Sequence, residues 1–399
     1  MKYRLLAAVG GLLLAAGPAA TAQRLTGKVL DASTGQPVPY ASVAVLNTAL
    51  GTTSNAEGEF ELVGVALPGR LVVSELGHQR DTVAVATAGP PLQIRLRPAS
   101  VLLPEVQVGS YLGDLIAQAY RELRRTYPQK QYGQAFFRQV TQLDGDPTEV
   151  QEMVWDAASN SSGLEGTALA HGRFAKKKGL LNFNNFSVYT KQYVLCNPQE
   201  DSSTQKSIIG LHVADYLKLK LLSVTQNGAQ QLVEIGFTSK SGDGPVPIQG
   251  SMVIDEATHQ LLRVRLQATN IHIKSNNPTF KFKNEVTQIE WGFVPRPGGA
   301  ATLDYLKVDY RTDMGRLMKT DVRIHVASFA YCYNGRPTPD ARVTYAPAKG
   351  GEVDLALIKQ TTYDPAFWQN NAVVKRTPLE EQVMKSFEQK GAFGTMLAP

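Results

Sequence analysis

The sequence predicts a mainly β protein, in which a β-sandwich is followed by an α+β domain built on an antiparallel sheet. Short apolar runs recur about every 8–12 positions between turn residues before residue 109, as in sandwiches. Later runs alternate strictly between apolar and polar side chains, and two segments have helical spacing. With 399 residues, 43% apolar and 19% charged, the chain is long enough for several domains and too apolar to be mostly disordered.

Residues 1–22 have the composition of a secretory signal peptide. A short basic end precedes an apolar stretch from Leu5 to Ala16, and Ala20-Thr21-Ala22 offers small residues at a cleavage site. We therefore expect cleavage after Ala22 and export of the rest. The apolar stretch is shorter than the roughly 20 residues that span a bilayer, and no later segment is apolar over such a length. The mature chain is thus expected to have no transmembrane segment.

The charge of the chain argues against a nucleic-acid partner. The chain has 41 Lys and Arg against 35 Asp and Glu, and removing residues 1–22 takes away two basic residues and no acid. The remaining formal charge of +4, from 39 basic and 35 acidic residues, is dispersed, with one tight run at Lys176-Lys177-Lys178. Nucleic-acid binding requires basic side chains clustered on one face, so we expect none.

The expected strands of the first domain lie between residues 25 and 96. Gly35 and Pro37 end the first of them, because glycine accepts a positive φ and proline cannot continue a ladder. Residues 55–59 form a second turn. Six apolar runs can be located, and the spacing of runs and turns indicates about seven strands in all. The six runs are 25–30, 41–46, 60–63, 71–74, 82–85 and 92–96. Together they predict a sandwich over residues 23–108.

Four sequence blocks of this region follow one another in the same order as in a known domain family. They are Gly27–Asp31, Thr34–Val43, Gly51–Phe60 and Glu75–His78. They resemble the carboxypeptidase regulatory-like domain, a transthyretin-like β-sandwich of bacterial envelope proteins. Leu103–Val108 resembles the strand that closes this domain in TonB-dependent outer-membrane transporters. His78 departs from the pattern, which usually has Tyr there. The resemblance implies a module without catalytic residues, located in the periplasm or at the outer membrane of a Gram-negative cell.

Residues 109–370 are predicted to form the α+β domain. Residues 110–127 place apolar side chains at helical spacing with three arginines opposite, and Pro128 ends the helix. Strands dominate afterwards. Apolar and polar side chains alternate over 233–238, 262–268, 306–311 and 321–326. One apolar and one polar face is what an antiparallel sheet covered on one side requires.

A turn between two of these strands carries a second resemblance. Residues 255–259 follow the strand Gly250–Ile254, and this arrangement resembles the repeated hairpins of lipoprotein-carrier half-barrels. In that family a curved sheet wraps a helix and shelters an acyl chain. The resemblance implies a curved sheet with a few helices and a lipid ligand, and the alternative is a curved sheet without a ligand.

Residues 371–399 are predicted to form a C-terminal helix and tail. Thr377-Pro378-Leu379-Glu380 combines a capping hydroxyl, proline at the first helical position and Glu three residues after the cap. Leu379, Val383 and Phe387 form an apolar stripe, and Gly391 is placed to end the helix. We expect residues 392–399 to be frayed, and the aromatic segment 365–368 to pack against the sheet.

The residues of common catalytic sites are missing. None of the six histidines is followed by Glu at the third position, as a zinc carboxypeptidase requires. The sequence also lacks a Gly-x-Ser-x-Gly nucleophile turn, phosphate-binding glycine motifs and a 12-residue calcium loop. We therefore predict a protein without catalytic function, metal or cofactor.

Two sets of residues remain as candidate features. Phe183, Phe186, Tyr189 and Tyr193, interspersed with asparagines, either form a loop that stacks on a glycan or cap the edge of the sheet. Cys196 and Cys332 would be exported to an oxidising space, so they either form one disulfide or stay as two free thiols.

These observations lead to an expected function. We expect an exported, non-catalytic envelope protein whose sandwich is a docking or spacer module for a protein or glycan partner. One alternative is a periplasmic or outer-membrane carrier of a lipid or lipoprotein acyl chain in the C-terminal sheet. A second alternative is a hydrolase without a recognisable motif.

Overall fold

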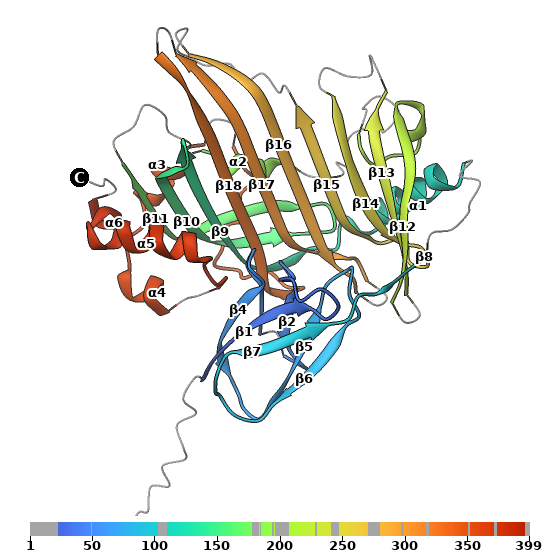
Figure 1. Cartoon of the computed structure of the whole chain (residues 1–399), viewed down its shortest axis with the longest axis horizontal. Coiled ribbons are helices and arrows are strands. Elements are labelled where there is room, and N and C mark those ends of the chain that lie inside the picture. Colours follow the sequence, from blue (N-terminus) through green and yellow to red (C-terminus); the bar gives the residue numbers. More distant parts are fainter. Residues whose placement is uncertain are drawn as a thin grey trace, which may run out of the picture.

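The computed structural model describes residues 23–48, 50–102, 110–177, 183, 185–193, 195, 207–227, 230–240, 247–269, 280–296, 299–316, 319–349, 352–370 and 373–395. The expected signal peptide and the strand expected at Leu103–Val108 lie outside these ranges. The described part is mainly β, as predicted, and consists of a small sandwich docked on a large curved antiparallel sheet (Figure 1).

The sandwich has seven strands, of which all but β3 correspond to apolar runs identified in the sequence. They are β1 (Gln23–Asp31), β2 (Ser42–Val45), β3 (Gly51–Thr53), β4 (Glu59–Val65), β5 (Gly69–Ser74), β6 (Asp81–Val85) and β7 (Leu92–Leu96). One sheet has the order β4-β1-β7 and the other β3-β2-β5-β6. Alternate side chains from both sheets, among them Val29, Phe60, Val73 and Ile94, fill a single core between them.

The turn before β4 illustrates how local sequence shapes this sandwich. The side-chain oxygen Oδ1 of Asn55 accepts hydrogen bonds from the backbone N–H groups of Glu57 and Glu59, each at 2.9 Å. Gly58 has a φ of 74°, and a Cβ there would lie 2.6 Å from the backbone oxygen of Val29. Only glycine fits this position without strain, which explains the Asn-x-x-Gly spacing that marked the turn.

The large sheet has the order β11-β10-β9-β18-β17-β16-β15-β14-β13-β12-β8. Its strands are β8 (Ser100–Leu102), β9 (Gln131–Leu143), β10 (Asp146–Ser159), β11 (Leu164–Lys176), β12 (Leu217–Asn227), β13 (Gln230–Ser239), β14 (Ile248–Asp255), β15 (Leu261–Thr269), β16 (Phe280–Val294), β17 (Thr302–Arg316) and β18 (Lys319–Arg336). Most neighbours are consecutive hairpins. The exceptions are β9 against β18, and β8 against β12.

One face of this sheet, which we call the helix face, is covered by α1 (Tyr111–Thr126), as predicted for residues 110–127. The short helical turn η1 (Val213–Asp215) packs beside α1, whereas α2 (Val188–Gln192) and α3 (Asp354–Ile358) pack on β11. Ile116 of α1 shares one buried cluster with Trp155 of β10 and Met252 of β14. Side chains from strands far apart in the sheet therefore meet around α1, which lies behind β12–β14 in Figure 1.

The opposite face, which we call the sandwich face, carries the sandwich and the C-terminal helices α4 (Pro365–Asn370), α5 (Pro378–Gln389) and α6 (Ala392–Thr395). The predicted start of α5 is confirmed by both hydrogen bonds of a capping box between Thr377 and Glu380. Two expectations were wrong. Leu379 is 50% exposed, because Met384 replaces it in the buried stripe with Val383 and Phe387.

The second wrong expectation concerns the end of the chain. After Gly391, at a φ of 63°, the chain forms α6 rather than a frayed tail, and Ala392 and Phe393 are buried. Phe393 packs with Phe387 of α5 and with Val140 and Val150 of the sheet, so apolar burial holds this segment in place. Residues 396–399 lie outside the described ranges.

Candidate functional site

The register of the large sheet aligns one continuous row of side chains on the sandwich face. Side chains alternate between faces along each strand, so residues paired across neighbouring strands share a face. From β12 to β11 the row consists of Lys220, Gly236, Ser251, Arg265, Glu290, Lys307, Phe329, Arg138, Glu152 and Arg173. Most of these residues are charged or polar, so this face needs partners or water along its whole width.

The β9–β11 end of the row is a buried ion network beneath the C-terminal helices. The carboxylate of Glu152 accepts from Arg138 Nε at 2.7 Å and from Arg173 Nε at 2.7 Å. Arg138 also reaches Glu380 of α5, and the Arg173 guanidinium lies 4.5 Å from the Trp368 ring centroid. Although burial opposes ionisation, the two arginines hold the pKa of Glu152 well below its usual range. This network fixes the helices to the sheet.

The middle of the row is covered by the sandwich through Tyr40. Its ring stacks on Phe329 and Tyr305 at centroid distances of 5.3 and 5.7 Å, and Lys307 Nζ lies 3.9 Å from its centroid. Tyr40 has a φ of 58°, a conformation that non-glycine residues rarely adopt, so the backbone is bent at the residue that makes the contact.

A second set of contacts joins the sandwich to β15. His78 lies between two carboxylates, with Nδ1 2.7 Å from Glu75 Oε2 and Nε2 3.0 Å from Asp31 Oδ2, and Glu75 also contacts Arg263 Nη1 at 3.2 Å. The hydrogen bond to Glu75 raises the pKa of His78 despite partial burial. The histidine that departs from the family pattern therefore braces the sandwich against the sheet.

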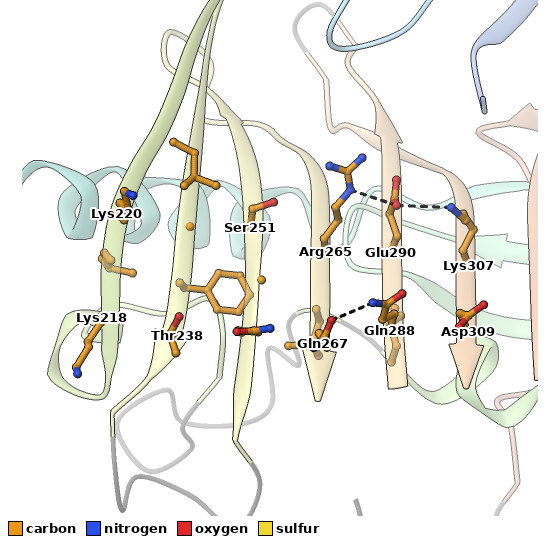
Figure 2. A pocket seen from close by; sticks show the side chains of 18 residues that line it. Lys218, Lys220, Thr238, Ser251, Arg265, Gln267, Gln288, Glu290, Lys307 and Asp309 are labelled. Carbon is orange, nitrogen blue, oxygen red and sulfur yellow. Dashed lines mark hydrogen bonds and ion pairs between the residues drawn. The ribbon is translucent and has the colours of Figure 1, made fainter. Parts of the chain in front are cut away.

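The β12–β17 part of the sandwich face is left open as a groove of about 830 Å³. A second row runs parallel to the first across these strands and consists of Lys218, Thr238, Gln249, Gln267, Gln288 and Asp309. Figure 2 shows both rows from the open side, with α1 behind the strands. Gly236 carries no side chain, so Leu222 lies across it and supplies an exposed apolar patch.

The acidic groups of the groove are already paired. Glu290 accepts from the Tyr305 hydroxyl at 2.6 Å and from Arg265 Nε at 3.2 Å, and Lys307 Nζ lies 3.7 Å away. Burial opposes ionisation, but these two cations and the hydroxyl lower the pKa of Glu290. Asp309 pairs with His325 at 2.6 Å. The two carboxylates therefore hold neighbouring side chains of the protein in place.

The groups left for a ligand lie at the β12–β14 end. Within the described part of the chain, the side chains of Lys218, Lys220, Thr238 and Gln249 have no hydrogen bond or ion pair, and all four are exposed. Two cations, a hydroxyl and an amide therefore line this end of the groove. Figure 2 shows the labelled Lys218 and Lys220 on β12 and Thr238 on the neighbouring β13. Sequence reasoning missed this site, although the alternation of polar residues along each strand was visible.

The predicted aromatic cluster lies on the other face. Phe186 is buried in the main core, 4.7 Å from Tyr189 and 6.3 Å from Tyr310 by ring centroids, and Phe183 packs at its edge. Burial makes Phe186 inaccessible as a stacking surface for a glycan. Tyr193, 42% exposed, stacks on Tyr189 at 5.6 Å. These rings mainly cover the helix face of the sheet.

Cys332 lies on β18, and Cys196 is outside the described residues, so the alternatives of one disulfide and two free thiols both stay predictions. Burial raises the pKa of Cys332 to about 12, which keeps it a thiol at neutral pH. A thiol is a weak nucleophile, so this cysteine has no activated character. Within the described ranges, no group of three or more His, Cys, Asp or Glu side chains is arranged to hold a metal ion.

The sandwich topology, the Asn55–Gly58 turn and the bridge at His78 coincide with the positions that a family model matches. Residues 25–108 are a CarboxypepD_reg-like domain. Such a domain is non-catalytic in itself. The CarboxypepD_reg-like domain extends past the sandwich, because β8 lies within the matched residues but pairs with β12 of the large sheet. The domain is thus tied to the large sheet by a strand as well as by side chains.

A search of curated proteins finds no match for this chain. Among the described residues, no helix has the length and apolar character needed to cross a membrane.

Proposed function

We propose that this protein is an exported, non-catalytic binding protein of the bacterial envelope, in the periplasm or at the outer membrane. In this proposal the CarboxypepD_reg-like domain is a rigid brace on the large sheet, and the partner docks beside it in the open groove of β12–β17. The composition of residues 1–22 and the family match at 25–108 support export to the envelope.

The single observation that carries the proposal is the division of the sandwich face. Its β9–β18 half is largely covered by Tyr40 and by the C-terminal helices, which leave a smaller pocket of about 340 Å³ between them. Its β12–β17 half holds a groove of about 830 Å³ with unpaired donors. Ligand sites typically have volumes of about 300–1,000 Å³ with a few convergent polar groups. Among the described residues that line the groove, no acid is free to serve as a general base, because Glu290 is held by Arg265 and Asp309 by Arg311.

The packing of the helix face favours a partner on the other side of the sheet. An acyl chain carried there would have to displace α1, whose Leu112, Ile116 and Ala119 are fully enclosed by the sheet. Mass spectrometry of an organic extract of the purified protein checks this point. We expect no stoichiometric acyl chain, and finding one would favour the carrier function.

Photocrosslinking in native cells tests the docking proposal. Benzoylphenylalanine in place of Leu222 lies in the groove, and the same group in place of Lys281, exposed on β16 outside it, is the matched control. We expect adducts with an envelope protein or glycan from position 222 and none from position 281. Equal labelling from both positions would remove the support for the groove as the docking site.

A further inference from the structure

The unpaired groups of the groove identify the chemistry of its ligand. At the β15–β17 end the polar side chains pair with one another. Gln288 Nε2 donates to Gln267 Oε1 at 2.9 Å, and Glu290 contacts two cations. Among the described residues at the β12–β14 end, the free charges are Lys218 and Lys220, and both are positive. A complementary ligand therefore has anionic groups at β12 and hydrogen-bonding groups along the remainder of the groove.

The direction of the groove limits the shape of that ligand. The two rows cross six neighbouring strands, from β12 to β17, and the strand spacing of about 4.8 Å gives a track of roughly 24 Å perpendicular to the strands. Side chains of one row lie two residues from those of the other, for example Arg265 and Gln267 on β15. An elongated ligand that lies between the rows contacts a new pair of polar side chains at each strand except β13, where Gly236 leaves Thr238 as the single row side chain.

Other elongated ligands fit this track less well. An extended peptide is recognised through backbone hydrogen bonds at a sheet edge, but the backbone groups of β13–β17 are already paired on both sides. A fatty acyl chain has no group that pairs with the two free lysines, and it would remove their charges from water without compensation. A hydroxyl-rich chain satisfies Thr238 and Gln249 along its length, and its non-polar ring faces can lie against Leu222.

We propose that the groove binds an acidic oligosaccharide, laid across the strands with carboxylate groups at Lys218 and Lys220 and hydroxyl groups at Thr238 and Gln249. This assignment rests on the proposed function, since it names the partner that docks on the open half of the sandwich face. Recognition depends on side chains alone, so it is sensitive to single substitutions in the two rows.

Calorimetric titration of the purified exported chain tests this assignment. The probes are a galacturonic acid tetramer and the neutral galactose tetramer. The variant K218Q/K220Q removes both free cations, and K281Q/K283Q removes two exposed lysines at the same spacing on β16, outside the groove. A third variant, T238W, fills the groove from an exposed position. Thermal melts of all three establish that they remain folded.

We expect the acidic tetramer to bind at least tenfold more tightly than the neutral one, and added salt to weaken it. K218Q/K220Q should weaken acidic binding by on the order of tenfold, as expected for loss of two partly screened charge contacts. K281Q/K283Q should bind as the wild type does, and T238W should bind neither tetramer.

Equal affinity for the two tetramers, or no loss in K218Q/K220Q, would overturn the assignment. Phosphatidylglycerol vesicles are a further probe, and lysine-dependent binding of vesicles without binding of the acidic tetramer would assign the groove to a lipid headgroup instead. If crosslinks form at position 222 while the acidic tetramer fails to bind, this assignment fails and the docking function stands. If position 222 forms no specific crosslinks and the acidic tetramer does not bind, both the docking function and the oligosaccharide assignment are wrong.

Discussion

Replacing Glu152 by Gln removes the negative charge that lies between Arg138 and Arg173 beneath the C-terminal helices. Glu152 and Arg173 are each 1% exposed, so water cannot replace the lost interaction. Breaking a buried ion pair by removing one partner typically costs about 3–5 kcal/mol, because the remaining charge stays buried and uncompensated. Glu380 and Glu388 still contact the two arginines from partly exposed positions, so we expect a loss of about 3 kcal/mol.

Urea unfolding followed by tryptophan fluorescence measures this loss, since Trp368 lies directly on the Arg173 guanidinium. Glu122→Gln is the matched control, because its partner Arg125 is mostly exposed and a surface pair contributes about 0–1 kcal/mol. Replacing Arg138, Glu152 and Arg173 together by Met, Leu and Met should recover much of the stability. A Glu152→Gln variant within 1 kcal/mol of wild type would refute the reasoning.

Three further predictions concern the contacts of the sandwich and Cys332. The raised pKa of His78 means that protonated His78 stabilises the folded protein below its unfolded pKa, near 6.5, and that this contribution is lost as pH rises through the folded pKa. Melting temperatures from pH 5 to 9 should therefore fall more for wild type than for His78→Gln, and parallel curves would contradict this. Tyr40→Ala should lower the free energy of unfolding by about 1–3 kcal/mol, because it removes two ring contacts and one cation–π contact. Amide hydrogen exchange should then become faster in the sandwich and in β17–β18. Unchanged exchange in these elements would argue against the role of Tyr40 as a brace. Because its pKa is about 12, Cys332 should resist iodoacetamide at pH 8 until the protein is unfolded, as peptide mapping would show, and rapid labelling of the native protein would contradict this.

Much of the fold was predictable because its signals are local. Asn55 and Gly58 identify a turn through their own conformational preferences, and Thr377 and Glu380 identify a helix start through hydrogen bonds only three residues apart. The apolar spacing of residues 110–127 predicted α1 in the same way. The C-terminal stripe was assigned less well, because Leu379 and Met384 are both apolar and only packing decides which of them is buried.

The aromatic residues near position 186 show the limit of such reasoning. A cluster of Phe, Tyr and Asn is compatible with an exposed loop and with the cover of a core, and both have the same local sequence. The structure buries Phe186 beside Tyr310, more than a hundred residues later in the chain. No pattern near residue 186 contains this information.

The sequence by itself determined the alternation of each strand, the turns and caps, the family of residues 25–108 and the missing motifs, because each of these depends on neighbours along the chain. The tertiary structure decided which polar faces meet. Arg138 lies beside Phe329, and Lys220 lies in the same row as Lys307, only because strand register is set by pairing between distant segments. The buried ion network, the brace at Tyr40 and the groove between the two rows all follow from that register.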